Sequence, residues 1–434
     1  MKALTKREWN TGFGLVAAIA TGLSIGVAIA PAPVQAQEEE VLPPEERRGT
    51  TVLRRQHPEV DPLGIRLGGF MMFPRVEFEE QYDDNIFADE EAEIDDLITV
   101  VRPGMALFSN WGNHQLRLDY NSEIGRYASN DAEDYEDHNV LLFTELDITR
   151  EIQLQASGSF ALGHEQRGSP DDVGGEEPTG TQTYSGKIGY QQRITRYTVR
   201  VEASKAEKRF DNVPAAGGVD IINTDRDRSE EAINLRVGRR FTPEYEIFFS
   251  TGFSRERYKE RVDQEGFQRD AEVVSGAGGV NFDFSGVTFG EISAGVQQSE
   301  YADPAFESVL APWINAAVTT NVTRLTTVKG FLRTAVRPTT IADASSFSDY
   351  SVGGSVDHEL RRNAILSTNI SFNRSDYDGI DRVDNQLTYG LKLKYMMNRN
   401  AHVNVGYNYV ERLSNVNGSD YRQNVFSVNL RVHF

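Results

Sequence analysis

The chain has 434 residues, a net charge of -20 at pH 7, 10% aromatic residues and no cysteine. The absence of cysteine excludes disulfides, thiolate metal sites and a cysteine nucleophile, and the acidic charge argues against nucleic acid as a partner. A single soluble core usually divides beyond roughly 250–300 residues, whereas a closed β-barrel grows by adding strands.

Residues 1–36 have the pattern of a secretory signal peptide. A basic start with Lys2, Lys6 and Arg7 precedes an apolar stretch, and Ala36 ends a small-residue cleavage site. The alternative is an uncleaved membrane helix, since the apolar stretch is long enough to span. Residues 37–66 are charged and proline-rich, so we expect a flexible periplasmic tail that buries little apolar surface.

Residues 67–434 alternate apolar and polar side chains in segment after segment. In His114–Tyr127, for example, Leu116 and Leu118 oppose Arg117 and Asp119, as expected for a strand with one apolar face. Gaps between segments are alternately short and long, and the long ones are acidic. The pattern predicts an all-β fold, a transmembrane antiparallel up-and-down β-barrel of about eighteen strands (16–18) with short periplasmic turns and long acidic extracellular loops.

The last strand, Tyr421–Phe434, supports a barrel of the outer-membrane type. One face is apolar and ends on an aromatic residue at the interface, so we interpret it as the assembly signal. Its residues are Phe426, Val428, Leu430, Val432 and Phe434. A girdle of aromatic residues is expected near the short turns, formed by Tyr190, Tyr197, Phe241, Tyr245, Phe284, Phe289 and Tyr395 with Phe434. The alternative, a soluble all-β sandwich or solenoid, predicts no alternation of turn lengths.

Two motifs at the start of the barrel resemble a known family. H-P-E-V-D-P-L-G-I-R-L-G-G-F (57–70) and Y-D-D-N-I-F (82–87) resemble the β-barrel porin type 2 family of proteobacterial outer membranes. The motif residues are Asp61, Pro62, Gly64, Arg66, Tyr82, Asp83, Asp84 and Asn85. His57 departs from the family pattern, which has arginine there. Some members resemble barrel components of exopolysaccharide export, and the resemblance implies no catalytic residues.

The opposite parity of the strands supplies candidate lumen-facing residues. They are Arg117, Asp119, Glu123, Arg200, Arg236, Lys392, Lys394 and Arg431. We expect them to pair across neighbouring strands and to set the field inside the pore. Candidate Ser–His or His–Asn pairs, such as Ser355 with His358 and His402 with Asn404, are expected by chance in this chain. Asp83-Asp84-Asn85 lacks the glycine-centred loop of a calcium site. We therefore expect no enzyme activity, metal or cofactor.

The predicted function is a porin-like conduit in the outer membrane of a Gram-negative bacterium, and the resemblance adds exopolysaccharide export. The alternative is a plugged structural or adhesion barrel whose acidic loops bind surface partners or divalent cations. The expected partners are outer-membrane lipid and lipopolysaccharide, the barrel assembly machinery and a periplasmic polysaccharide-export protein. Nucleic acid is not among them.

Overall fold

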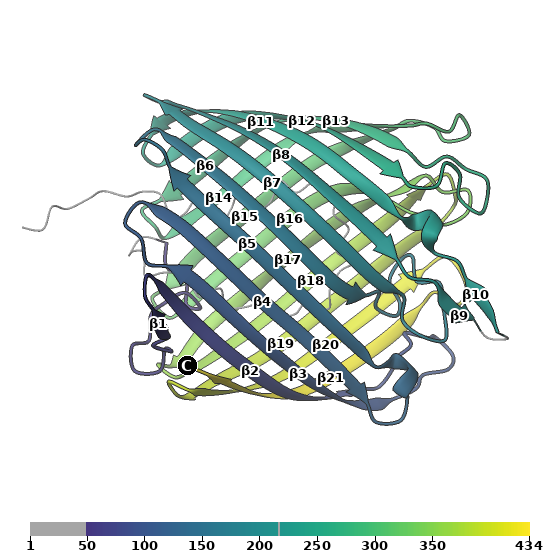
Figure 1. The fold of residues 1–434 in the computed structure, drawn as a ribbon, viewed down its shortest axis with the longest axis horizontal. Helices are drawn as coiled ribbons and strands as arrows, with labels where there is room; N and C mark the ends of the chain where they lie inside the picture. The colour runs from purple at the N-terminus through teal and green to yellow at the C-terminus, as the bar shows by residue number, and fades with distance from the viewer. Residues whose placement is uncertain (1–48, 216–217) are drawn as a thin grey trace, which may run out of the picture.

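The computed structural model describes residues 49–215 and 218–434. Eighteen antiparallel strands form a closed barrel wall, in which each strand pairs with its neighbours in the chain and β2 (Phe70–Asp83) pairs with β21 (Tyr421–His433) (Figure 1). The other wall strands are β3 (Asp96–Ser109), β4 (His114–Tyr127), β5 (Tyr135–Asp147), β6 (Ile152–His164), β7 (Gly180–Ile194), β8 (Tyr197–Phe210), β11 (Arg228–Thr242), β12 (Tyr245–Tyr258), β13 (Ala271–Phe284), β14 (Thr288–Tyr301), β15 (Val309–Thr323), β16 (Thr326–Pro338), β17 (Ser346–Arg361), β18 (Ala364–Asp378), β19 (Val383–Asn398) and β20 (Ala401–Ser414). The predicted barrel of about eighteen strands is confirmed.

Smaller elements decorate this wall. A short strand, β1 (Ile65–Leu67), forms a hairpin with β2. Two of the loops that join wall strands carry further elements. The 3-10 turn η2 (Asp131–Glu133) lies between β4 and β5, and the loop between β8 and β11 carries the hairpin of β9 (Val213–Ala215) and β10 (Val219–Ile221) and the 3-10 turn η3 (Thr224–Arg226). Among the described residues, no helix has both the length and the apolar character needed to cross a membrane.

The two faces of the wall follow from the alternation in sequence. On β21, Phe426 and Val428 are 53% and 55% exposed, whereas Asn429 is 3% exposed on the inner face. A wall with apolar side chains outside and polar ones inside is stable against lipid rather than water. Tyr197 and Phe241 lie on the outer face as expected, but the expectation for Phe289 is wrong. Phe289 shares the inner face of β14 with Glu291 and is buried, because it lies two residues from a lumen-facing residue.

The strands begin and end differently at the two ends of the barrel. At one end, here called the turn end, the predicted bounds hold closely, and turns such as Ser285-Gly286 are tight. Both residues have positive φ (57° and 70°), as a type I′ hairpin turn requires. At the other end, here called the loop end, strands run further than predicted. For example, the alternation predicts a strand at Ala364–Asn373, whereas β18 begins at the same residue at the turn end and runs on to Asp378 at the loop end. Beyond the membrane both faces meet water, so the alternation fades there while backbone pairing continues.

The chain before the wall does not match the expected flexible tail throughout. Residues 1–48, which include the predicted signal peptide and part of the tail, lie outside the described residues. Residues 51–62, here called the strap, instead pack on the inner wall at the turn end. Val52 is 1% exposed and packs on Ile365 and Met396, and its N–H donates to Thr327 Oγ1 (2.9 Å). The prolines and charges of this segment predicted that it would be solvated. Its few apolar residues instead pack on an apolar patch of the inner wall formed by Ile365 and Met396.

Candidate functional site: the lumen and its two ends

The inner wall carries all of the predicted lumen residues. They come from β4 (Arg117, Asp119 and Glu123), β8 (Arg200), β11 (Arg236), β19 (Lys392 and Lys394) and β21 (Arg431). The register of the strands puts each on the face opposite the exposed apolar side chains. Because successive side chains of a strand point to opposite faces, the residues of the inner face can be predicted from the sequence.

Many of these charges pair across strands, close to the seam between β2 and β21. Arg431 lies 2.7 Å from Glu77 on β2. Arg102 on β3 contacts both Glu123 on β4 (2.8 Å) and Glu79 on β2 (3.1 Å). Cross-strand pairs of opposite charge stabilise a sheet, so this part of the lumen is a fixed network of charges. The pair of Arg117 and Asp119 differs, because both lie on β4, two residues apart.

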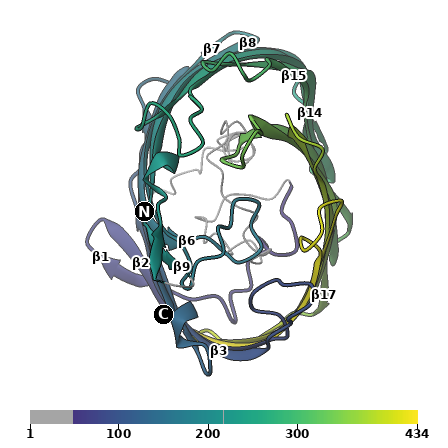
Figure 2. The same cartoon turned by 90° about the vertical axis from the view of Figure 1, so that its right-hand side faces the viewer.

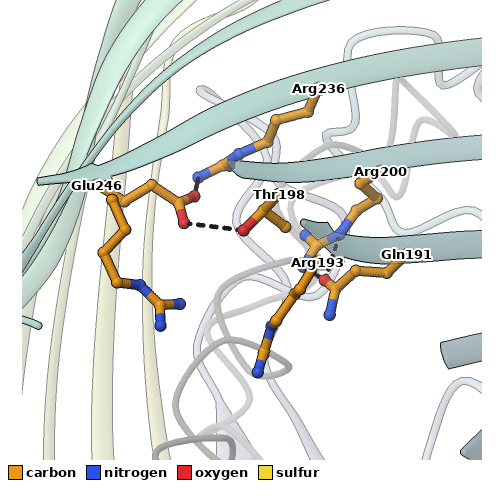
Figure 3. A pocket seen from close by; sticks show the side chains of 7 residues that line it. Gln191, Arg193, Thr198, Arg200, Arg236 and Glu246 are labelled. Carbon is orange, nitrogen blue, oxygen red and sulfur yellow. Dashed lines mark hydrogen bonds and ion pairs between the residues drawn. The ribbon is translucent and has the colours of Figure 1, made fainter. Parts of the chain in front are cut away.

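A second group of charged residues lies at the turn end on β7, β8, β11 and β12. Arg200 and Arg236 are joined there by Arg193 and Arg240, which line the same pocket together with Glu246 (Figure 3). Arg193 and Arg240 were not among the predicted lumen residues, because they lie next to short turns. The parity they share with Gln191 and Arg236, respectively, would have indicated that both face the lumen.

At the loop end, residues 165–179 between β6 and β7 fold into the mouth of the barrel. In a view from this end, the chain that follows β6 lies inside the ring of strands (Figure 2). This segment is here called the constriction loop. Its first anchor is Glu165, which lies 2.6 Å from Arg226 of η3. The sequence predicted a long acidic loop here but not its inward course.

The centre of the constriction loop is held by Arg167. Its guanidinium binds both carboxylate oxygens of Glu133 in η2 (2.9 and 2.5 Å) and lies 3.7 Å from Asp172. Burial disfavours the charged form of Arg167, but its hydrogen bond to Glu133 and the charges of Glu133 and Asp172 outweigh burial and raise its pKa. A two-pronged guanidinium–carboxylate pair of this kind fixes orientation as well as position.

The constriction loop also reaches the opposite wall. Arg412 on β20 donates to the carbonyl of Gly168 (2.7 Å), and Thr339, just after β16, donates to Asp171 (2.7 Å). The loop between β16 and β17 is itself held inward by Arg269, which donates to the carbonyls of Thr339 and Ala344 (2.7 and 2.8 Å). Two loops therefore meet across the mouth and narrow it.

The motif Y-D-D-N lies at the seam of the barrel. Asp84 accepts hydrogen bonds from the backbone and side chain of Asn424 (2.6 and 2.7 Å), and Asp83 accepts one from Gln423 (2.7 Å). Asn85 is fully buried and donates to the carbonyl of Arg422 (2.8 Å). These polar side chains join the first strand to the last. Among the described residues, no group of three or more potential ligands is arranged to hold a metal ion.

The earlier motif, D-P-L-G-I-R, forms the connection from the strap to β2. The Asp61 carboxylate accepts from the His57 backbone in a turn. Gly64 has a φ of +71°, and a Cβ there would meet the ring of Phe73 at 2.7 Å, so both backbone and space require glycine. Arg66 lies in β1 and Pro62 just before Gly64. The motif therefore shapes a bend that brings the strap back into the lumen.

The residues considered as catalytic pairs lie apart or are otherwise engaged. Ser355 and His358 have opposite parity on β17 and so face opposite sides of the wall, where His358 contacts Thr326 (2.9 Å). His402 and Asn404 share the inner face of β20, but Asn404 donates to Asn429 (2.8 Å) and His402 lies 3.4 Å from the Val60 carbonyl. These contacts belong to the wall and the strap.

A family model described as "Putative beta-barrel porin 2" matches residues 57–434. The chain belongs to this porin family. The match begins at His57, in the strap, and includes every wall strand. The porin is therefore an outer-membrane β-barrel. Barrels of this type have short turns on the periplasmic side and long loops on the outside.

Several solved structures are similar to this porin. The ferric enterobactin receptor PfeA from Pseudomonas aeruginosa is 6% identical with a TM-score of 0.44, and the alignment covers 84% of this chain and 80% of that one. The outer membrane protein opdK from the same organism is 12% identical with a TM-score of 0.43, covering 84% and 99%. The iron transporter FrpB from Neisseria meningitidis is 9% identical with a TM-score of 0.45, covering 78% and 63%. No curated protein sequence matches this chain significantly.

Proposed function

We propose that this porin is a conduit for hydrophilic solutes across the outer membrane. The observation that carries the proposal lies in the middle of β16, where Phe331 on the inner face and Leu332 on the outer face are 40% and 39% exposed. Adjacent residues of one strand are both accessible only where the wall has open space on both sides. Barrels of 16–18 strands are wide enough for such a lumen.

The lining and the mouth would set what passes. Paired charges such as Arg431 with Glu77 give the lumen a polar surface, which suits hydrated solutes rather than apolar ones. The constriction loop narrows the loop end, so solute size would be limited there. As a finer proposal, which rests on family resemblance, the conduit serves exopolysaccharide export together with a periplasmic polysaccharide-export protein. We propose no enzyme activity, and the other expected partners are lipopolysaccharide and the barrel assembly machinery.

A specific observation also favours the second candidate function, a plugged structural or adhesion barrel. The constriction loop is tied to both sides of the mouth through Arg167 and Arg412, and Arg269 holds the facing loop. Such a bridge would close the pore if it does not move. The outward surfaces of the loops would then act as the binding surface.

Conductance in planar bilayers separates the two functions. We expect discrete channel openings from the native porin and larger ones when residues 166–178 are replaced by a short glycine–serine linker. The matched control replaces residues 302–308, a loop at the same end that contacts its neighbour through Phe306 and Phe267. A silent native barrel that conducts after the first replacement is plugged. If neither the native porin nor the variant with residues 166–178 replaced conducts, although both are folded, the conduit proposal is contradicted.

The finer proposal needs a cellular test. Loss of the gene should abolish surface polysaccharide without loss of the polymer inside the cell, and the porin should co-purify with a periplasmic export protein. Normal surface polymer in the deletion strain would contradict the export role while leaving the conduit intact.

A further inference from the structure

We propose that the arginine cluster at the turn end binds oxyanion groups of the solute, namely carboxylate, phosphate or sulfate. The arginine cluster consists of Arg193, Arg200, Arg236 and Arg240, all on the inner wall and all lining one pocket (Figure 3). The inference deepens the proposed function, because it names the chemical class that the conduit recognises at its periplasmic end.

The register of the wall places like charges side by side in this cluster. Arg200 on β8 is directly opposite Arg236 on β11, and Gln191 on β7 is directly opposite Arg200. Like charges directly opposite each other destabilise a sheet. Neighbouring strands are about 4.8 Å apart, so the two guanidinium groups start from adjacent positions. The repulsion between Arg200 and Arg236 lowers the stability of the empty barrel. An anion bound between the two side chains would offset this repulsion, which would explain why both arginines are present.

Two carboxylates lie beside Arg236 in the cluster. Arg236 lies 2.8 Å from Glu291 and 3.9 Å from Glu246, and its guanidinium lies 3.4 Å from the centre of the Phe248 ring. These contacts fix Arg236 on the wall. The next carboxylate along β8, Glu202, is paired with Lys187 (3.1 Å). Arg200 and Arg236 therefore lie side by side with Glu291 and Glu246 bound on the Arg236 side, in a chain whose net charge is -20.

Arg200 is held in a position that suits a ligand. Its Nε and one of its terminal nitrogens both donate to the side-chain oxygen of Gln191 (3.2 and 2.6 Å). The partner is neutral, so the charge of Arg200 is oriented without being cancelled. Thr198 adds a hydroxyl on the same face, which donates to Glu246 (3.3 Å). Planar guanidinium groups bind carboxylate and phosphate through two parallel hydrogen bonds, which identifies the ligand class.

Binding to the purified full-length barrel in detergent tests the inference without requiring conduction. The probes are an oligosaccharide of uronic acids, a neutral oligosaccharide of equal length, and inorganic phosphate, measured by calorimetry at low salt. We expect the acidic oligosaccharide to bind, the neutral one to bind at least tenfold more weakly, and salt to weaken the binding. If phosphate competes with the acidic oligosaccharide, the cluster recognises the shared oxyanion; if it does not, recognition requires the saccharide carboxylates.

The decisive variant is Arg200→Gln, since Arg200 can be neutralised without leaving a buried carboxylate unpaired. It should weaken binding of the acidic oligosaccharide roughly tenfold, the loss of about one charge-assisted hydrogen bond, and Arg200→Lys should restore part of the affinity. The matched control is Arg333→Gln, an exposed arginine on the inner face of β16, which should change little. Equal affinity for the acidic and neutral probes, or equal losses from both glutamine variants, would overturn the inference. Binding by a barrel that does not conduct would instead count against the conduit alone.

Discussion

Replacing Asn85 with alanine should destabilise the closed barrel at its seam. The pairing of β2 with β21 covers residues 75–83 and 425–433, a shorter ladder than the pairing of β2 with β3 over residues 70–83. Beyond residue 83 the two strands are joined by one backbone hydrogen bond, from the Asp84 N–H to the Asn424 carbonyl (3.3 Å), and by several side chains. Asn85 is the most buried of these side chains, with 0% exposure. At the loop end of the seam, polar side chains therefore supply much of the contact between the first and last strands.

The expected cost follows from the groups that Asn85→Ala leaves behind. The Asn85 amide donates to the carbonyls of Asp89 and Arg422 (both 2.8 Å) and accepts from the Asp89 N–H (3.1 Å). An unsatisfied buried group costs about 1–3 kcal/mol. Two of the three are close to the surface, where water replaces part of the loss. We therefore expect the free energy of unfolding to fall by roughly 2–5 kcal/mol.

Urea unfolding of the porin in lipid vesicles, followed by tryptophan fluorescence, measures this loss. The control is Asn417→Ala, at an exposed position of the loop between β20 and β21. It should shift the midpoint very little, since exposed substitutions usually stay within about 0.5 kcal/mol. A loss below about 1 kcal/mol for Asn85→Ala, or an equal loss for the control, would refute the role assigned to the seam.

Three further predictions concern orientation, assembly and the strap. A protease site inserted after Gly218, between β9 and β10, should be cleaved on intact cells, whereas one at Thr149 in a short turn should not, because we expect the long loops outside and the short turns in the periplasm; equal cleavage contradicts this orientation. Phe434→Lys should lower the amount of heat-modifiable porin in the membrane although it costs only about 0–1 kcal/mol at the interface, and normal levels would remove Phe434 from the assembly signal. Arg55→Ala should increase proteolysis of the strap, because the strap loses the ion pair between Arg55 and Glu359 (2.6 Å); unchanged proteolysis would mean that this ion pair does not hold the strap.

The features that could be predicted are those encoded by neighbouring residues. Alternation along His114–Tyr127 fixed which side chains face the lumen, and the bounds of that strand agree with the structure. Phe289 was misplaced because closeness to a turn does not determine the face, whereas its parity with Glu291 does. At the loop ends the strands continue where both faces are wet, and no pattern marks their limits.

The features that could not be predicted depend on partners far away in the chain. Gly168 meets Arg412 across 244 residues, and Val52 meets Thr327 across 275. Nothing near residue 168 distinguishes an inward loop from an outward one, since glycine, proline and carboxylates suit both. The arginine cluster could be predicted only in part. Each strand supplies one or two of its residues, whose faces follow from the alternation, but only the register of β7, β8 and β11 brings them together.

The position of the strap has a consequence for the order in which the chain assembles. From Val60 to Val52 the strap runs along the inner wall from β20 toward β16, strands that are synthesised last. Before β2 meets β21, docking must close a loop of about 275 residues, at an entropic cost of roughly 5 kcal/mol. After ring closure β2 is only a few strands from β19, and that cost falls by about 2 kcal/mol. Docking of the strap is therefore cooperative with ring closure, and a spectroscopic label at Val52 would report when a nascent barrel becomes a ring.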